Sequence, residues 1–374
     1  VATNTAGNAV WLSFLFAALI AMLTGLSYAE LSSMYPRDGA EYEYTKHFFG
    51  RRFALVVGLM IVLSGVVSSA TVALGFAEYF RALFQTPILL MAIGLIALCS
   101  WVNYHGIKES AKLNIFFTAV ETLGLVIIIF LGLKHLGSVD YFDMPYGFIG
   151  VLRASALVFF AYMGFEAIVT LTEETKNAKR NISKAIILSV IITSLIYVLV
   201  ALSAVSILDW QSLGSSSAPM ADVAAASMGP IAFIILGIIA LFSTANTVLI
   251  QSVTSSRIVY GMACDSALPK MLRRVSCSRN TPLFAIIAVG LVMVLFSFIK
   301  DIELVANITT LFLFITFATI NVTVIVLRYK APKVKRPFRI PVNIGKFQVL
   351  AFLGAISSLI LLYFAFTNIL QILA

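Results

Sequence analysis

An apolar stretch between residues 147 and 171 carries a glycine and a carboxylic acid close together near its middle. The sequence there is Phe160-Ala161-Tyr162-Met163-Gly164-Phe165-Glu166. Glycine costs about 1 kcal/mol relative to alanine in a helix, and an ionisable group near the bilayer centre costs about 2.5–3.5 kcal/mol. Non-helical backbone at membrane depth survives where it is buried in protein or lines a cavity, and the ends of such half-helices bind ions and zwitterions. We therefore predict a discontinuous helix that carries a small-molecule site.

Glu121 is a second carboxyl group expected at membrane depth. It lies eight residues after Leu113, where the predicted span 113–133 begins, and hence about 12 Å into the bilayer at a rise of 1.5 Å per residue. The hydrocarbon core is about 30 Å thick, so this position is near its middle. Intramembrane carboxylates usually face the bundle interior and mark proton or ion pathways; the structural alternative is a protonated glutamate bonded to a neighbouring helix. We predict that Glu121 takes part in proton or ion coupling.

Small polar side chains in two other spans are further candidates. Ser64 and Ser68 share one face of the second span, where they could line a substrate cavity or make helix-packing contacts. Ser243, Thr244 and Asn246 gather in the seventh span. Their oxygens suit a hard cation such as sodium, and they suit interhelical hydrogen bonds equally well.

The composition requires a membrane around these residues. Of 374 residues, 60% are hydrophobic and only 11% are charged, whereas about a quarter of the residues of a globular domain are charged. At about 20 apolar residues per crossing, we predict an all-α polytopic protein. Its ten spans cover residues 9–29, 53–77, 86–102, 113–133, 147–171, 184–208, 229–254, 282–299, 303–328 and 348–371.

The basic residues alternate between the loops. Of the 26 Lys and Arg, 22 lie in one set of loops, and the other set holds Arg81, Lys134, Arg153 and Lys300. The positive-inside rule makes the first set cytoplasmic, so the net charge of +9 reports topology and a nucleic-acid partner is excluded. Ten spans then put both termini outside, and no signal sequence precedes Val1. We expect a truncated chain that lacks an upstream helix; the alternative is a ten-span protein with a cleaved leader.

The sequence offers little to enzyme chemistry. Three cysteines and three histidines are scattered, and no P-loop, GxSxG or HExxH pattern occurs, so we predict neither a metal site nor a cofactor. Two connecting segments have a composition of their own. Residues 211–228 could form a short helix over the outer mouth or a flexible loop. Residues 328–346 combine three prolines with seven basic residues, which favours a semi-rigid connector near anionic headgroups.

Four motifs together resemble a known family. They are Gly25-Leu-Ser-Tyr-Ala-Glu-Leu31 with the following Tyr35-Pro-Arg-Asp-Gly-Ala-Glu-Tyr42, then Phe159–Glu166, then Ser256–Pro269, and finally Leu311–Arg328. In this order, over nearly the whole chain, they resemble the amino acid–polyamine–organocation permeases, particularly the ApcT-like and cationic amino acid transporter branches. The resemblance implies a LeuT-like fold of two inverted repeats. The chain would hold family helices 2 to 11, with residues 1–134 the remainder of the first repeat, 147–328 the second and 348–371 an additional helix.

The resemblance also implies roles for the residues at the break. The backbone carbonyls of Phe160, Ala161 and Met163, beside Gly164, would receive the α-ammonium group of an amino acid, and the Phe160 ring would close over the substrate. Family helix 1 would hold the α-carboxylate. Glu121 stands where ApcT-like members have a lysine, which replaces a fixed amine by a carboxyl group that can carry a proton or bind a cation.

We therefore expect a secondary amino acid transporter of the plasma membrane that works by alternating access with proton coupling. An exchanger and a sodium-coupled transporter are the alternatives within the class. Outside it, the alternatives are an ion channel or receptor, which should show pore-lining rings or a filter loop that we do not find, and a non-transporting scaffold. The expected partners are an amino acid and the lipid bilayer, and the sequence specifies no oligomeric state.

Overall fold

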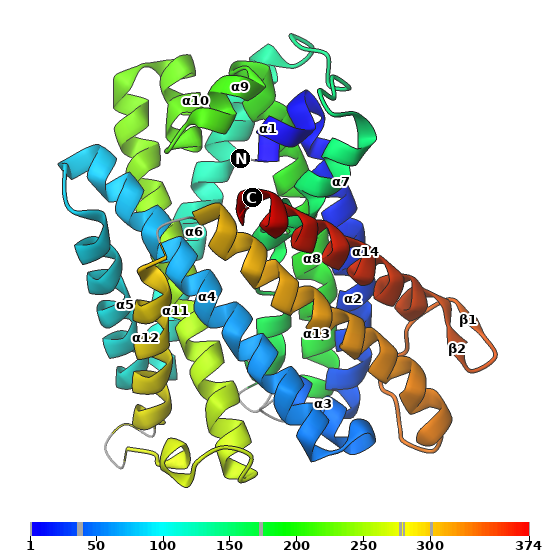
Figure 1. Ribbon diagram of the computed structural model, residues 1–374. Helices are drawn as coiled ribbons and strands as arrows, with labels where there is room; N and C mark the ends of the chain where they lie inside the picture. The colour runs from blue at the N-terminus through cyan, green and yellow to red at the C-terminus, as the bar shows by residue number, and fades with distance from the viewer. Residues whose placement is uncertain are drawn as a thin grey trace.

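A computed structural model describes residues 2–35, 40–171, 175–276, 279, 281–299 and 302–373. Helices dominate it (Figure 1), and nine of those in the described residues are long and apolar enough to cross a membrane. The remaining predicted span, 282–299, corresponds to a shorter apolar helix, α12 (Leu283–Ser297). The all-α polytopic class is therefore confirmed. The long helices are α2 (Val10–Met34), α4 (Arg51–Phe84), α5 (Ile88–His105), α6 (Ile107–Gly132), α8 (Ala178–Ile207), α11 (Pro230–Cys264), α13 (Ile302–Lys330) and α14 (Val349–Leu373), with the ninth span formed by the interrupted segment Gly147–Leu171.

Local backbone signals set the helix ends. Gly50, with φ +84°, precedes α4, and Gln85 ends it in a left-handed conformation with Pro87 just beyond. Gly229, with φ +85°, precedes α11, whose first residue is Pro230, a favoured first helical position. These signals let α4 and α11 run to 34 and 35 residues, longer than the bilayer requires.

Short elements fill the two ends of the bundle. At one end lie α1 (Ala2–Ala6), α9 (Trp210–Ser215) and α10 (Pro219–Met228), and at the other lies α3 (Ala40–Phe49) (Figure 1). The Asp209 side chain accepts the Ser212 N–H and so caps α9. The helical alternative for residues 211–228 is thus confirmed, as two helices. We call the end that carries α3 the basic face, since it adjoins the loops rich in Lys and Arg.

The remaining elements are short. The 3-10 helices are η1 (Gly7–Ala9), η2 (Leu133–His135), η3 (Phe159–Tyr162), η4 (Glu166–Leu171) and η5 (Lys270–Arg273), and α7 (Gly147–Val158) begins the interrupted segment. Strands β1 (Asn343–Ile344) and β2 (Phe347–Gln348) form an antiparallel hairpin just before α14. In the bundle, α2 packs against α8, and α4 packs against both α11 and α13.

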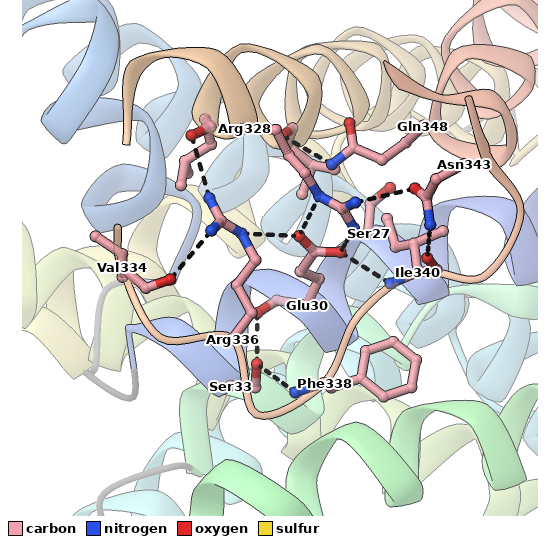
Figure 2. Close-up of polar contacts among 12 residues, drawn as sticks. Ser27, Glu30, Ser33, Arg328, Val334, Arg336, Phe338, Ile340, Asn343 and Gln348 are labelled. Atoms are coloured by element: carbon pink, nitrogen blue, oxygen red, sulfur yellow. Dashed lines mark hydrogen bonds and ion pairs between the residues drawn. The ribbon is translucent and has the colours of Figure 1, made fainter. Parts of the chain in front are cut away.

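A buried acid fixes the connector between α13 and α14. Glu30, on α2, is 1% exposed and binds Arg328 through two hydrogen bonds of 3.1 and 2.7 Å (Figure 2). Its carboxylate also accepts the Ile340 N–H at 2.8 Å and forms an ion pair with Arg336 at 3.3 Å. The connector is therefore held to α2, because Arg336 from the connector and Arg328 from the last turn of α13 both point inward to Glu30. This differs from the expectation that they would lie at lipid headgroups.

Candidate functional site

The predicted helix break is present. The segment is α-helical through Val158 and continues as η3 (Phe159–Tyr162), and the next helix, η4, starts at Glu166, so residues 163–165 belong to no helix. Gly164 has φ +123°, a conformation that favours glycine, and its N–H donates to the Glu166 carboxylate at 2.9 Å. The α-helical pattern of i to i−4 hydrogen bonds is thus interrupted at membrane depth.

The carbonyl groups at the break are partly used within the backbone. The Phe160 carbonyl accepts the Met163 N–H at 3.3 Å, and the Gly164 carbonyl accepts the Ala167 N–H at 3.0 Å. A carbonyl oxygen has two lone pairs, so the Phe160 carbonyl retains capacity for a second donor such as an ammonium group. The Ala161 side of the break is exposed, whereas Phe159 and Tyr162 are buried against their neighbours.

The break opens into a cavity of about 470 Å³. This volume lies within the range of about 300–1,000 Å³ found for ligand pockets. Its walls come from α4, α6, the break itself, α8 and α11. Nine of the ten predicted site residues line it, namely Ser68, Glu121, Phe160, Ala161, Met163, Gly164, Ser243, Thr244 and Asn246. Residues from distant parts of the sequence therefore meet in one cavity.

Ser64 is the predicted residue that the structure places elsewhere. It lies one helical turn before Ser68 on α4, and its hydroxyl donates to the Ile61 carbonyl at 2.8 Å. It lines a separate small cavity that also includes Glu41 and Glu166. The hydrogen bond of Ser64 thus lies within α4 and is neither a contact with the central cavity nor a bond between helices.

Glu121 belongs to a polar seam between α6 and α11. The Ser243 and Asn246 side chains of α11 interact with its carboxyl group. The Asn246 side chain donates to Thr118 at 3.2 Å, and Thr118 donates to Asn114 at 3.3 Å. This chain of contacts makes one wall of the cavity polar, and among the described residues that line the cavity Glu121 is the one carboxylic acid.

Sequence reasoning did not select seven polar residues of the cavity as site residues, namely Asn114, Thr118, Thr122, Thr193, Tyr197, Thr247 and Gln251. Asn114, Thr118 and Glu121 recur at spacings of four and three on one face of α6, which is the signal that could have found the first two. Tyr197 packs edge to face on Tyr162 at 5.3 Å between ring centroids. It also lines a second cavity of about 260 Å³ toward α10, beside Met220.

These features define a polytopic helical membrane protein built around a discontinuous helix and a polar central cavity. A family model described as amino acid permease matches residues 1–371. The chain therefore belongs to the amino acid permease family, within the amino acid–polyamine–organocation superfamily. The family expectation is confirmed, and so is the expectation of a membrane transporter in place of an enzyme.

Three relatives with similar sequences are named as a permease or transporters. The chain is 27% identical over 359 residues to the branched-chain amino acid permease BcaP of Bacillus subtilis, which covers 90% of this chain and 77% of BcaP. It is 28% identical over 366 residues to the methylthioribose transporter of the same organism, covering 91% and 78%. Cationic amino acid transporter 4 of Mus musculus is 29% identical over 356 residues, covering 88% of this chain and 56% of that protein. The chain thus spans little more than half of the mouse relative.

Proposed function

We propose that this protein is a secondary active transporter of amino acids that works by alternating access and couples transport to protons through Glu121. The observation that carries the proposal is the helix break that opens into the central cavity, because interrupted helices expose backbone dipoles to ions and zwitterions at membrane depth. The LeuT-like arrangement, with residues 1–134 and 147–328 as inverted repeats, belongs to the same proposal. So does a location in the plasma membrane.

The amino acid would lie along the break. Its α-ammonium group would face the carbonyls of Phe160, Ala161 and Met163, and the Phe160 ring would close over it. The substrate side chain would extend toward Ser68 and the seam between α6 and α11. The branched-chain, cationic and methylthioribose names of the relatives define the first panel of compounds.

Proton coupling is assigned to Glu121 on three grounds. It is a carboxylic acid at membrane depth, it faces the cavity, and hydroxyl and amide groups of α11 surround it. Sodium is the competing ion, because the oxygens of Ser243, Thr244 and Asn246 are hard ligands.

The test is uptake by purified protein in proteoliposomes. Radiolabelled leucine, arginine and methylthioribose are offered with an inward proton gradient, an inward sodium gradient or neither. Accumulation above equilibrium that requires the proton gradient supports the proposal. Accumulation that requires sodium overturns the assignment of proton coupling. Single-channel currents without accumulation overturn the assignment as a transporter and favour an ion channel. The protein is also heated with each compound of the panel and with each of the twenty standard amino acids. If none of them stabilises it, the transporter assignment is wrong and a non-transporting scaffold is the better description.

A further inference from the structure

The small polar cavity that Ser64 lines lies between the helix break and the basic face. Its described lining residues include Glu41 of α3, Glu166 and Thr170 of η4, Ser64 of α4, and Ser255 of α11. The free volume is about 10 Å³, which is close to that of a single water-sized probe. An amino acid cannot enter it, so its function is separate from substrate binding.

Two carboxyl groups face this cavity and both are buried. Glu41 is 1% exposed and Glu166 is 5% exposed. The Oε1 atom of Glu41 accepts the Tyr28 hydroxyl at 2.9 Å, whereas its Oε2 atom is buried without a hydrogen-bond partner among the described residues. The Ser255 hydroxyl is unpartnered in the same sense. Unpartnered buried polar atoms are costly, so two of them on one small cavity indicate an occupant.

The charges around the cavity are unbalanced. None of its described lining residues is Lys, Arg or His. The titratable groups that interact with Glu41 are Tyr28 of α2 and Glu166 of η4, and Tyr28 in turn interacts with Tyr44 of α3. From α11, Arg257 donates to the Thr170 carbonyl at 3.2 Å, and α13 contributes the Phe317 ring packed on Tyr28.

Two ionised carboxylates in such a small, buried space repel each other and lose hydration. One shared proton removes the repulsion and satisfies a lone pair, as in other pairs of buried carboxyl groups.

We propose that Glu41 and Glu166 form a proton-binding site, separate from Glu121, on the side of the helix break that faces α3. Glu166 connects this site to the central cavity, because its Oε2 atom accepts the N–H of Gly164, which lines that cavity. Binding a proton between the carboxyl groups weakens Glu166 as an acceptor for Gly164 and so alters the break. This link to substrate binding rests on the proposed function, whereas the proton site itself does not.

The chemistry of Glu41 agrees with this assignment. The pKa of Glu41 is raised from 4.5 to about 7, because burial and, to a smaller extent, the neighbouring Glu166 carboxylate outweigh the hydrogen bonds that lower it. This difference makes the folded protein bind the proton roughly 300-fold more tightly than the unfolded chain. The stabilisation by this proton is therefore fully present below about pH 4.5 and is lost as the pH rises through about 7.

The experiment follows the apparent unfolding temperature of the full chain in lipid nanodiscs from about pH 4.5 to about pH 8. Glu41→Gln removes the group that titrates, and Glu166→Gln removes the charge that favours its protonation. Glu78→Gln is the control, because Glu78 lies near the end of α4 that is farther along the chain from α3 and does not line the small cavity. Infrared spectra at about pH 5 and about pH 8 report protonated carboxyl groups independently.

We expect the control to keep the wild-type decline in stability with pH, Glu41→Gln to flatten it, and Glu166→Gln to move its midpoint to lower pH. The infrared band of protonated carboxyl groups should lose the contribution of Glu41 in Glu41→Gln and so become weaker than in the wild type. An unchanged midpoint in Glu166→Gln overturns the pairing even if Glu41→Gln fails to fold. If sodium stabilises the wild type at about pH 8 and Glu41→Gln abolishes this effect, the site binds a metal cation and the assignment of a proton is wrong. If the pH profile behaves as expected but no amino acid is transported, the proton site stands and the proposed function fails.

Discussion

The buried acid at the basic face allows a quantitative test of what holds the connector between α13 and α14. Glu30→Gln preserves the shape of the side chain but removes its charge and leaves Arg328 and Arg336 facing an amide. The Arg328 side chain is 12% exposed and that of Arg336 is 5% exposed, so solvent compensates neither charge fully. The Ile340 N–H also loses a charged acceptor. We expect the connector to detach from α2.

The magnitude follows from the burial of the network. Removing one partner of a buried ion pair costs about 3–5 kcal/mol. The partial exposure of Arg328 favours the lower end, about 3 kcal/mol, which corresponds to roughly a hundredfold increase in the population of the detached connector. Asn343→Ala is the matched control, because it removes the uncharged side-chain contacts of an exposed residue, one with Arg328 at 3.0 Å and one with the Ile340 carbonyl at 2.7 Å, and leaves Glu30 in place. Its effect should stay within about 0.5 kcal/mol.

Limited trypsin digestion provides the assay, since Lys333, Lys335 and Arg339 lie in the connector and are exposed. Cleavage requires local opening, so its rate follows the population of the detached state when closing is fast. Glu30→Gln should raise the rate of cleavage there by roughly a hundredfold. A rate within about twofold of the Asn343→Ala rate, with an unchanged unfolding temperature, would refute the role of Glu30 as an anchor.

Two further substitutions probe the central cavity, and a third probes the packing of α4 on α11 beside the small cavity. Glu121→Gln should lower concentrative uptake on the order of tenfold and spare exchange, because it removes the titrating carboxyl. If the variant keeps both activities at the wild-type level, Glu121 has no part in the mechanism. Gly164→Ala should cost about 1–3 kcal/mol and weaken amino acid binding in a thermal-shift assay, since φ is +123° while the new Cβ would meet no atom within 4 Å. The control Gly75→Ala meets no atom either, lies within α4 and should be neutral or stabilising. Gly65→Ala should lower the unfolding temperature through a 2.6 Å contact of its Cβ with the Ser255 hydroxyl, and adding Ser255→Ala should restore it; a persistent defect would place the strain elsewhere.

The sequence was sufficient to find the spans but not their ends. A rule of about 20 apolar residues limits a span to the thickness of the bilayer. Helix α4 is longer than this and continues to its C-cap Gln85, and α11 continues to Cys264. The short helix α3 was not anticipated, because half of Ala40–Phe49 is polar and the segment lies in a loop that the charge rule assigns to the cytoplasm. Hydropathy identifies segments that contact lipid, and it does not identify a helix such as α3 that packs on the end of the bundle.

The candidate site was predictable where one helix carried the signal. The glycine and the acid at Gly164 and Glu166 indicated the break without reference to any other segment. Ser64 and Ser68 illustrate the limit, because they share a face of α4 yet line different cavities. Gln251 of α11 borders both cavities. Which cavity a residue joins depends on the depth at which another helix is interrupted, and helical spacing contains no such information.

Glu166 shows why the break and the acid occur together. An interrupted helix leaves the Gly164 N–H without its usual acceptor, and an unsatisfied backbone group at membrane depth costs several kcal/mol. The Glu166 carboxylate accepts that N–H at 2.9 Å and so stabilises the break. A neutral side chain would supply a weaker acceptor, because hydrogen bonds to ionised groups are roughly twice as strong. The group that stabilises the break is therefore itself an acid, and in the proton site proposed for Glu41 and Glu166 its protonation would weaken this hydrogen bond.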